Sequence, residues 1–154
     1  MTIRLKNFLG VIMSRKSIER SILFLDDDNA CLSQIAEATA KHLAPPRTRI
    51  FSAGVKPSNI PAHVIQAMKE LGISMTGQSA KGLADVPIQE IDLVISFDEA
   101  HKKCSNLPGR AKIENWRSKT RQLNRSDAAA ATQERDEINK RVFALFLDHW
   151  RNAS

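Results

Sequence analysis

The residues most able to do chemistry lie together where an apolar run meets a predicted helix. The run "SILFL" at 21–25 is followed by three carboxylates, Asp26, Asp27 and Asp28, and then by "NACLSQIAEA". A helix that begins directly after a buried strand offers unpartnered N–H groups to an anion. The chain therefore puts negative charge at a place that suits a phosphate.

One interpretation is metal-dependent phosphoryl transfer. An apolar strand followed by Asp-x-Asp resembles the start of the haloacid-dehalogenase-type phosphatases, in which one aspartate attacks phosphorus, another handles the proton and Mg²⁺ screens the charge. In this alternative Asp26 and Asp28 hold the metal. The segment "SFDEAHKK" at 96–103 is weakly similar to the later lysine and acidic pair of those enzymes. The same stretch also looks locally like a response-regulator receiver, but Asp98 comes too late for its phosphoacceptor.

The composition predicts one domain in a reducing compartment. A chain of 154 residues, 42% of them hydrophobic, is long enough for one core. The two cysteines, Cys31 and Cys104, form no disulfide framework, and no Cys/His cluster has metal-ligand spacing. We therefore expect no cofactor and a cytoplasmic location. The apolar run "FLGVIM" at 8–13 is too short to span a membrane and precedes no cleavage site.

Positive charge is distributed unevenly along the chain. The net charge is +6, and between His101 and Arg125 a single acid, Glu114, opposes many basic residues. Such a stretch suits an acidic partner, although a solvated loop is the plainer interpretation. Nucleic acid is disfavoured because no aromatic residues alternate with the charges. The candidate patch for an unknown acidic partner consists of Lys102, Lys103, Arg110, Lys112, Arg117, Lys119 and Arg121.

Predicted strands alternate with predicted helices. Apolar runs predict strands at 21–25, 48–54 and 91–97, and a weaker one at 110–116. Helical spacing predicts helices at 33–43, 61–72 and 132–150. The last helix should bury Ile138, Val142, Leu145 and Trp150. The alternation indicates a doubly wound α/β sheet in a single domain at 21–154, after an extension at 1–20.

The order of motifs from about 21 to 150 resembles the low-molecular-weight protein tyrosine phosphatases and, more closely, the thioredoxin-coupled arsenate reductases. "LFLDDDNACLSQIAEA" is similar to their phosphate loop, with Asn29 and Ser33 at the positions of the loop asparagine and hydroxyl. "FSAG", "AMKELGISMTGQSAKGL", "IDLVISF", "PGRAKIENW" and "RDEINKRVFALF" follow in the family's order. The resemblance implies a three-layer α/β sandwich with a four-stranded parallel sheet, of the phosphotyrosine protein phosphatase I-like type.

The departures from this family fall on its chemistry. Asp26 occupies the position of the nucleophilic cysteine, and Leu32 occupies that of the phosphate-binding arginine. The family's acidic loop should follow Trp116, but the next acid is Asp127. The thiolate attacks, the arginine steadies the transition state and the acid protonates the leaving group. Losing all three indicates that the family's reaction has been abandoned.

The cysteines do not restore a redox role. Phe97 stands at the first position of the later redox pair, so Cys104 is a remnant, and Cys31 lies in the loop where reductases often carry a non-nucleophilic cysteine. We expect both to be free thiols.

The sequence thus predicts a degenerate phosphate loop with no catalytic residue. A carboxylate at the base of this loop repels a phosphate by about 4 kcal/mol per charge pair at close range. We expect the loop to exclude anions and the protein to be an inactive binding or regulatory module. The loop consists of Asp26, Asp27, Asp28, Asn29, Ala30, Cys31, Leu32 and Ser33.

Overall fold

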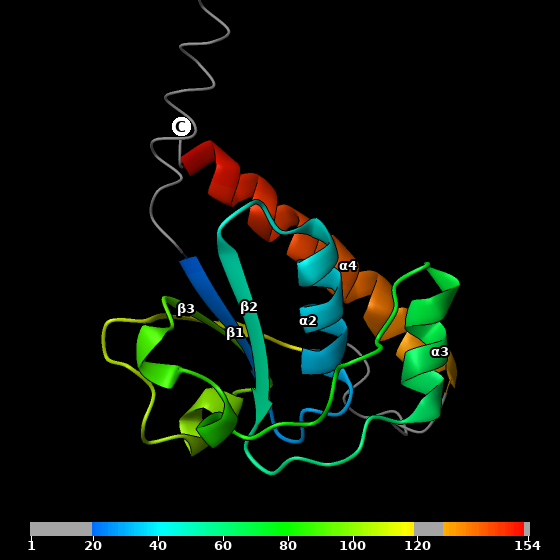
Figure 1. Ribbon diagram of the computed structural model, residues 1–154, viewed down its shortest axis with the longest axis horizontal. Helices are drawn as coiled ribbons and strands as arrows, with labels where there is room; N and C mark the ends of the chain where they lie inside the picture. The colour runs from blue at the N-terminus through cyan, green and yellow to red at the C-terminus, as the bar shows by residue number, and fades with distance from the viewer. Residues whose placement is uncertain (1–19, 119–127, 153–154) are drawn as a thin grey trace, which may run out of the picture.

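A four-stranded parallel sheet forms the centre of the molecule in a computed structural model that describes residues 20–118 and 128–152 (Figure 1). The strand order is β2-β1-β3-β4. The predicted positions of all four strands are confirmed, with ends that differ by a few residues. The strands are β1 (Arg20–Asp26), β2 (Thr48–Gly54), β3 (Leu93–Phe97) and β4 (Lys112–Trp116).

Strand β1 is covered on both of its faces. Ile22 and Phe24 belong to one apolar cluster, while Leu23 and Leu25 belong to another. Strands buried in this way need apolar residues at consecutive positions, which explains the uninterrupted run at 21–25. The carboxyl end of β1 lies inside the sheet, between those of β2 and β3.

The two faces of the sheet are covered by different kinds of helix. The first cluster packs against α2 (Leu32–Leu43), α3 (Ala62–Glu70) and α4 (Ala128–Asn152), which lie together in Figure 1. The second cluster lies against short 3-10 helices, η1 (Leu83–Asp85), η2 (Ile88–Glu90) and η3 (Ala100–Lys103). The predicted three-layer sandwich is confirmed, although one layer consists of single turns.

The helix ends differ from the sequence prediction in three places. α2 begins one residue before Ser33. α3 is shorter than 61–72, because Pro61 precedes its first turn and the chain leaves the helix before Gly72. Gly72 has a φ of 73°, which suits a residue just past a helix end. α4 begins at Ala128 rather than at 132, because the alanine run joins the helix.

The predicted inner face of α4 is only partly correct. Ile138 and Val142 are buried, whereas Leu145 is half-buried and Phe146, which the spacing did not select, is buried. The side chain of Trp150 and the proposed extension at 1–19 lie outside the described residues, and Arg20 already belongs to β1. Among the helices of the described chain, none is long and apolar enough to cross a membrane.

Candidate functional site

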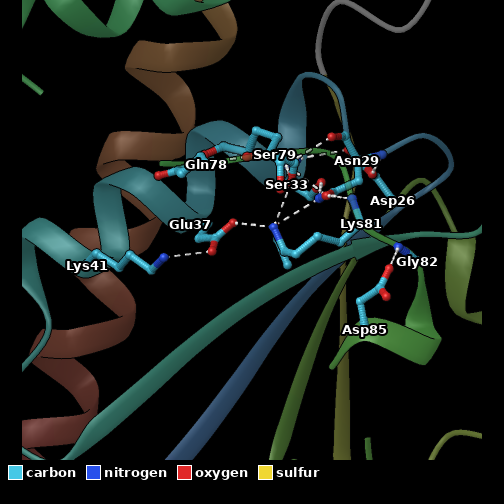
Figure 2. Close-up of polar contacts among 12 residues, drawn as sticks. Asp26, Asn29, Ser33, Glu37, Lys41, Gln78, Ser79, Lys81, Gly82 and Asp85 are labelled. Carbon is cyan, nitrogen blue, oxygen red and sulfur yellow. Dashed lines mark hydrogen bonds and ion pairs between the residues drawn. The ribbon is translucent and has the colours of Figure 1, made fainter. Parts of the chain in front are cut away.

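The candidate site is the loop between β1 and α2. Residues 27–31 connect Asp26, the last residue of β1, to Leu32, the first residue of α2. The loop lies at the carboxyl end of an interior strand, where open α/β sheets place their ligands. The structure therefore brings together the residues of the predicted phosphate loop, and Figure 2 shows polar contacts of three of them, Asp26, Asn29 and Ser33.

The carboxylate of Asp26 fills the inside of this loop. Its Oδ1 accepts the N–H of Asn29 at 2.6 Å, and its Oδ2 accepts the N–H of Ser33 at 2.9 Å. Only 3% of Asp26 is exposed. Main-chain N–H groups that converge at a helix start form an anion-binding concavity. In this chain the anion is a side chain of the protein itself.

Burial changes the acidity of Asp26. The pKa of this carboxyl is raised from 3.8 to about 6, mainly by loss of solvent contact and also by the nearby Asp28, while hydrogen bonds from Ser33 and Asn29 act in the opposite direction. The two N–H bonds stabilise the charged form without compensating for the loss of water. Asp26 is therefore an acid that changes charge near neutral pH.

Asn29 connects the loop to three other segments. Its backbone is left-handed, with a φ of 49°, and the residue is fully buried. The side-chain Nδ2 donates to Ser33 Oγ at 2.8 Å and to Ser52 Oγ at 2.9 Å. The Oδ1 accepts Gln34 Nε2 at 2.8 Å and the N–H of Lys81 at 2.7 Å. The loop shape is thus fixed by hydrogen bonds to α2, to β2 and to the segment before η1.

A buried carboxylate and a lysine lie behind the loop. Glu37, on α2, accepts the hydroxyl of Ser52 and also bonds the ammonium groups of Lys41 at 2.8 Å and Lys81 at 3.3 Å. The Lys81 ammonium further donates to the carbonyl of Ser79 at 2.9 Å. Figure 2 shows Lys81 reaching toward Glu37. Buried carboxylates need such partners, so this cluster ties α2 to β2 and to residue 81.

Sequence analysis did not single out Ser52, Glu37 or Lys81. Ser52 could have been found from the sheet, since it pairs in register with Phe24 on the neighbouring strand and points its hydroxyl at the loop. Lys81 lies in a segment without regular structure, and no periodic pattern indicates its position.

The position expected for an arginine contains an apolar side chain. Leu32 is 4% exposed and belongs to the core cluster, so it supplies no donor to the loop. Ala30 contributes only its N–H, which donates to Asp28 Oδ1 at 3.2 Å. At the mouth of the loop Asp27 forms an ion pair with Lys103 at 2.8 Å.

Two carboxylates, Asp98 and the previously unselected Glu134, lie near the segment after Trp116. The N–H of Ser118 donates to Asp98 Oδ1 at 3.0 Å, and the hydroxyl of Ser118 donates to Glu134. Asp98 comes from the end of β3, and Glu134 comes from α4. Sequence order alone could not indicate that these acids meet next to β4.

Both cysteines are free thiols, as predicted. Cys31 is buried at the start of α2, whereas Cys104 is partly exposed at the end of η3. Burial, together with the nearby Asp27, raises the pKa of the Cys104 thiol. Phe97, at the expected position of the missing redox partner, packs edge-on against Trp116. These contacts suit inert thiols.

The basic patch is partly neutralised by acids from other segments. Lys112 and Arg117 are exposed and form no ion pair with any other residue that the structure describes. Lys119 and Arg121 lie outside the described residues. The other three basic residues of the patch each form an ion pair: Lys102 with Glu99 at 3.1 Å, Lys103 with Asp27 at 2.8 Å and Arg110 with Asp92 at 2.8 Å.

A metal centre is not assembled in the described ranges 20–118 and 128–152. No group of three or more His, Cys, Asp or Glu side chains is arranged there to hold a metal ion. Both oxygens of Asp26 already accept N–H groups, and one oxygen of Asp28 does so as well. The arrangement thus offers few free carboxylate oxygens to a cation.

Comparison with known proteins agrees with the fold. A family model described as low molecular weight phosphotyrosine protein phosphatase matches residues 21–139. An arsenate reductase of Staphylococcus aureus (strain bovine RF122 / ET3-1) is 30% identical over 99 residues, which cover 64% of this chain and 76% of the reductase. An arsenate reductase of Bacillus subtilis (strain 168) is 32% identical over 96 residues, covering 62% and 69%.

A solved structure of an arsenate reductase in the phosphate-binding state superposes on this chain. The TM-score is 0.67 and the sequence identity is 26%, with 84% of this chain and 98% of that chain covered.

Proposed function

Since the chain belongs to the low-molecular-weight phosphotyrosine protein phosphatase family, we propose that it is a non-catalytic member that serves as a binding or regulatory module. The observation that carries this proposal is the position of the Asp26 carboxylate. It takes the N–H groups of Asn29 and Ser33, which an external anion would need. A chain that fills its own anion site has no use for that site in phosphoryl or arsenate chemistry.

The absence of a nucleophile supports the same proposal. A carboxylate that already accepts two hydrogen bonds and is 3% exposed is poorly placed for in-line attack. Leu32 adds no positive charge to balance a bound oxyanion, because its side chain lies in the core. Asp98 and Glu134 both bond Ser118 next to β4, and Asp98 Oδ2 is buried with no hydrogen-bond partner among the described residues.

The alternative is a Mg²⁺-dependent phosphotransfer enzyme that uses Asp26 and Asp28. Metal binding there requires that Asp26 exchange its N–H partners for a cation. The N–H donors at the start of a helix already stabilise a negative charge in the absence of a metal. The observed bonds of Asp26 therefore favour the non-catalytic proposal.

Activity assays test the proposal directly. We expect the wild-type chain to hydrolyse aryl phosphate no faster than buffer and to show no thioredoxin-linked reduction of arsenate. The Asp26→Ala variant serves as the matched control for contaminating enzymes. A turnover that survives purification and disappears in Asp26→Ala would overturn the proposal.

Anion binding tests whether Asp26 occupies N–H groups that could otherwise bind an added anion. Phosphate and formate should not raise the melting temperature of the wild type beyond the effect of added salt. In Asp26→Ala the N–H groups of Asn29 and Ser33 lose their acceptor, so formate should restore stability by mass action. Asp28→Ala, which leaves both N–H groups occupied, is the control and should not respond. A specific phosphate response of the wild type would contradict the proposed loop state.

A further inference from the structure

A hollow of about 1010 Å³ lies beside β4, away from the Asp26 loop. Its walls come from the starts of β1 and β3, from every residue of β4 except Ile113 and from the second half of α4. None of the lining residues belongs to the loop at 26–33. The function proposed above assigns no role to this surface.

Beside the hollow, the outer edge of β4 has main-chain groups that pair with no strand of the described chain. The N–H of Lys112 donates to Asp92, and the carbonyl of Trp116 accepts from Asp98, so alternate residues of β4 point toward β3. The main-chain groups of Ile113 and Asn115 therefore point away from the sheet. Within the described chain β4 has no second neighbour, and Ile113 is 41% exposed. An open edge of this kind accepts an added strand.

Four cations and three acids are among the residues that line the hollow. Asp92 bonds Arg110 and the N–H of Ser21, and Glu114 accepts the indole N–H of Trp116. Those two acids are thus occupied by partners within the chain. The lining cations are Arg20, Lys112, Arg117 and Arg141, against a third acid, Asp148.

The two cations at the ends of β4 are the most available ones. Lys112 and Arg117 are both exposed, and neither forms an ion pair with a residue in the described part of the chain. Arg141 is engaged by Glu137 at 3.4 Å and lies over the ring of Trp116 at 5.8 Å. An extended ligand along β4 would meet positive charge at each end.

We propose that β4 binds an acidic, extended peptide segment of a partner protein, which adds as a fifth strand. Its main chain bonds Ile113 and Asn115, and its carboxylates contact Lys112 and Arg117. This inference rests on the proposed function, because it takes the protein to be a binding module and names the class of partner. A peptide is favoured over nucleic acid because Trp116 is 7% exposed and packs against Phe24 and Phe97, which leaves no aromatic face for bases.

Binding of a model peptide to the full chain tests this proposal. The probe is a labelled peptide of about ten residues that alternates glutamate and threonine, and its charge-reversed partner alternates lysine and threonine. Fluorescence anisotropy at low salt should show binding of the acidic peptide only. Lys112→Glu combined with Arg117→Glu should weaken that binding by about tenfold. The matched control, Lys56→Glu combined with Lys69→Glu on other surfaces, should leave it unchanged.

A second variant tests the strand geometry separately from charge. Ile113→Pro removes an outward N–H and leaves the hydrogen bonds to β3 in place, so the fold should persist while binding falls by about tenfold. Unchanged binding in Ile113→Pro, equal binding of both peptides or no binding of either would overturn the proposal. Tighter binding of an oligothymidylate than of the acidic peptide would also overturn it. Turnover dependent on Asp26 would instead defeat the proposed function and leave this surface unaffected.

Discussion

Asp26 supplies from within the chain the negative charge that the N–H groups at the start of α2 attract. The carboxylate lies at 2.6 Å from the Asn29 nitrogen and 2.9 Å from the Ser33 nitrogen. The same two bonds that hold the loop closed also hold a charge away from water. At the scale of the residue, the two N–H bonds set the loop geometry and oppose the rise in pKa that burial causes, and both effects can be tested through the ionisation of Asp26.

The stability of the protein should depend on pH through Asp26. Its pKa rises from 3.8 to about 6 on folding, so between these values the native state binds more protons than the unfolded state. Stability from this group is therefore complete below about pH 4 and is lost as the pH rises through 6. The shift corresponds to about 3 kcal/mol.

Chemical denaturation of the wild type and of Asp26→Asn from about pH 4 to pH 7.5 measures this effect. The variant cannot ionise at residue 26, so the difference between the two unfolding free energies should fall by about 3 kcal/mol across the range. Titration of other groups cancels in that difference. Parallel curves for the two proteins would show that the Asp26 carboxyl has an ordinary pKa.

The sequence shows which residues form the loop, but it does not predict the contacts that they make. Asp26 at the position of the family's nucleophile and Leu32 at that of its arginine can be seen in the sequence, and they predict a changed loop. The charge of Asp26 suggests either repulsion of phosphate or metal binding. Its use of the loop's N–H groups depends on backbone angles, such as the φ of 49° at Asn29, that three-dimensional packing selects.

At the scale of elements, the loop after β1 is held by the segment after β2. The N–H groups of Val55, Lys56 and Ser58 donate to the carbonyls of Asp26, Asp27 and Asp28 at 2.7–3.1 Å. This pairing brings the two segments close together at Gly54. A Cβ atom at residue 54 would lie 2.6 Å from the Asn29 nitrogen and 2.6 Å from the Asp28 carbonyl carbon. Both atoms belong to the main chain, so neither can move aside cheaply.

Gly54→Ala should therefore destabilise the protein by about 1–3 kcal/mol, through displacement of the loop. Gly109→Ala is the matched control, because a Cβ there has no neighbour within 4 Å. Urea denaturation of both variants measures the difference. A Gly54→Ala protein as stable as the control would show that the two segments are not held this closely.

Elements with strong local patterns were predictable, and those without them were not. The run at 21–25 and the spacing along α4 specify a buried strand and an amphipathic helix from local residues alone. The turns η1, η2 and η3 contain three or four residues each, too few for a periodic signal. The contribution of Lys81 depends on the packing of such an irregular segment against α2.

At the scale of the whole molecule, the fold and the loop chemistry are separable. The family match extends over residues 21–139, and the sheet has two complete apolar clusters. None of that packing requires a cysteine at 26 or an arginine at 32. A chain can therefore keep the family's sheet and helices while its phosphate loop contains different residues.

A magnesium titration of the whole protein distinguishes this view from metal-dependent catalysis. Any ligand that prefers the native state raises the melting temperature by mass action. Mg²⁺ would have to compete for Asp26 with two N–H donors and for Asp28 Oδ1 with the N–H of Ala30. About 10 mM MgCl₂ should therefore give the same melting temperature as NaCl of equal ionic strength, measured near pH 7.5 where Asp26 is ionised. A magnesium-specific rise that disappears in Asp26→Asn would establish a metal site at the loop and make phosphotransfer the better proposal.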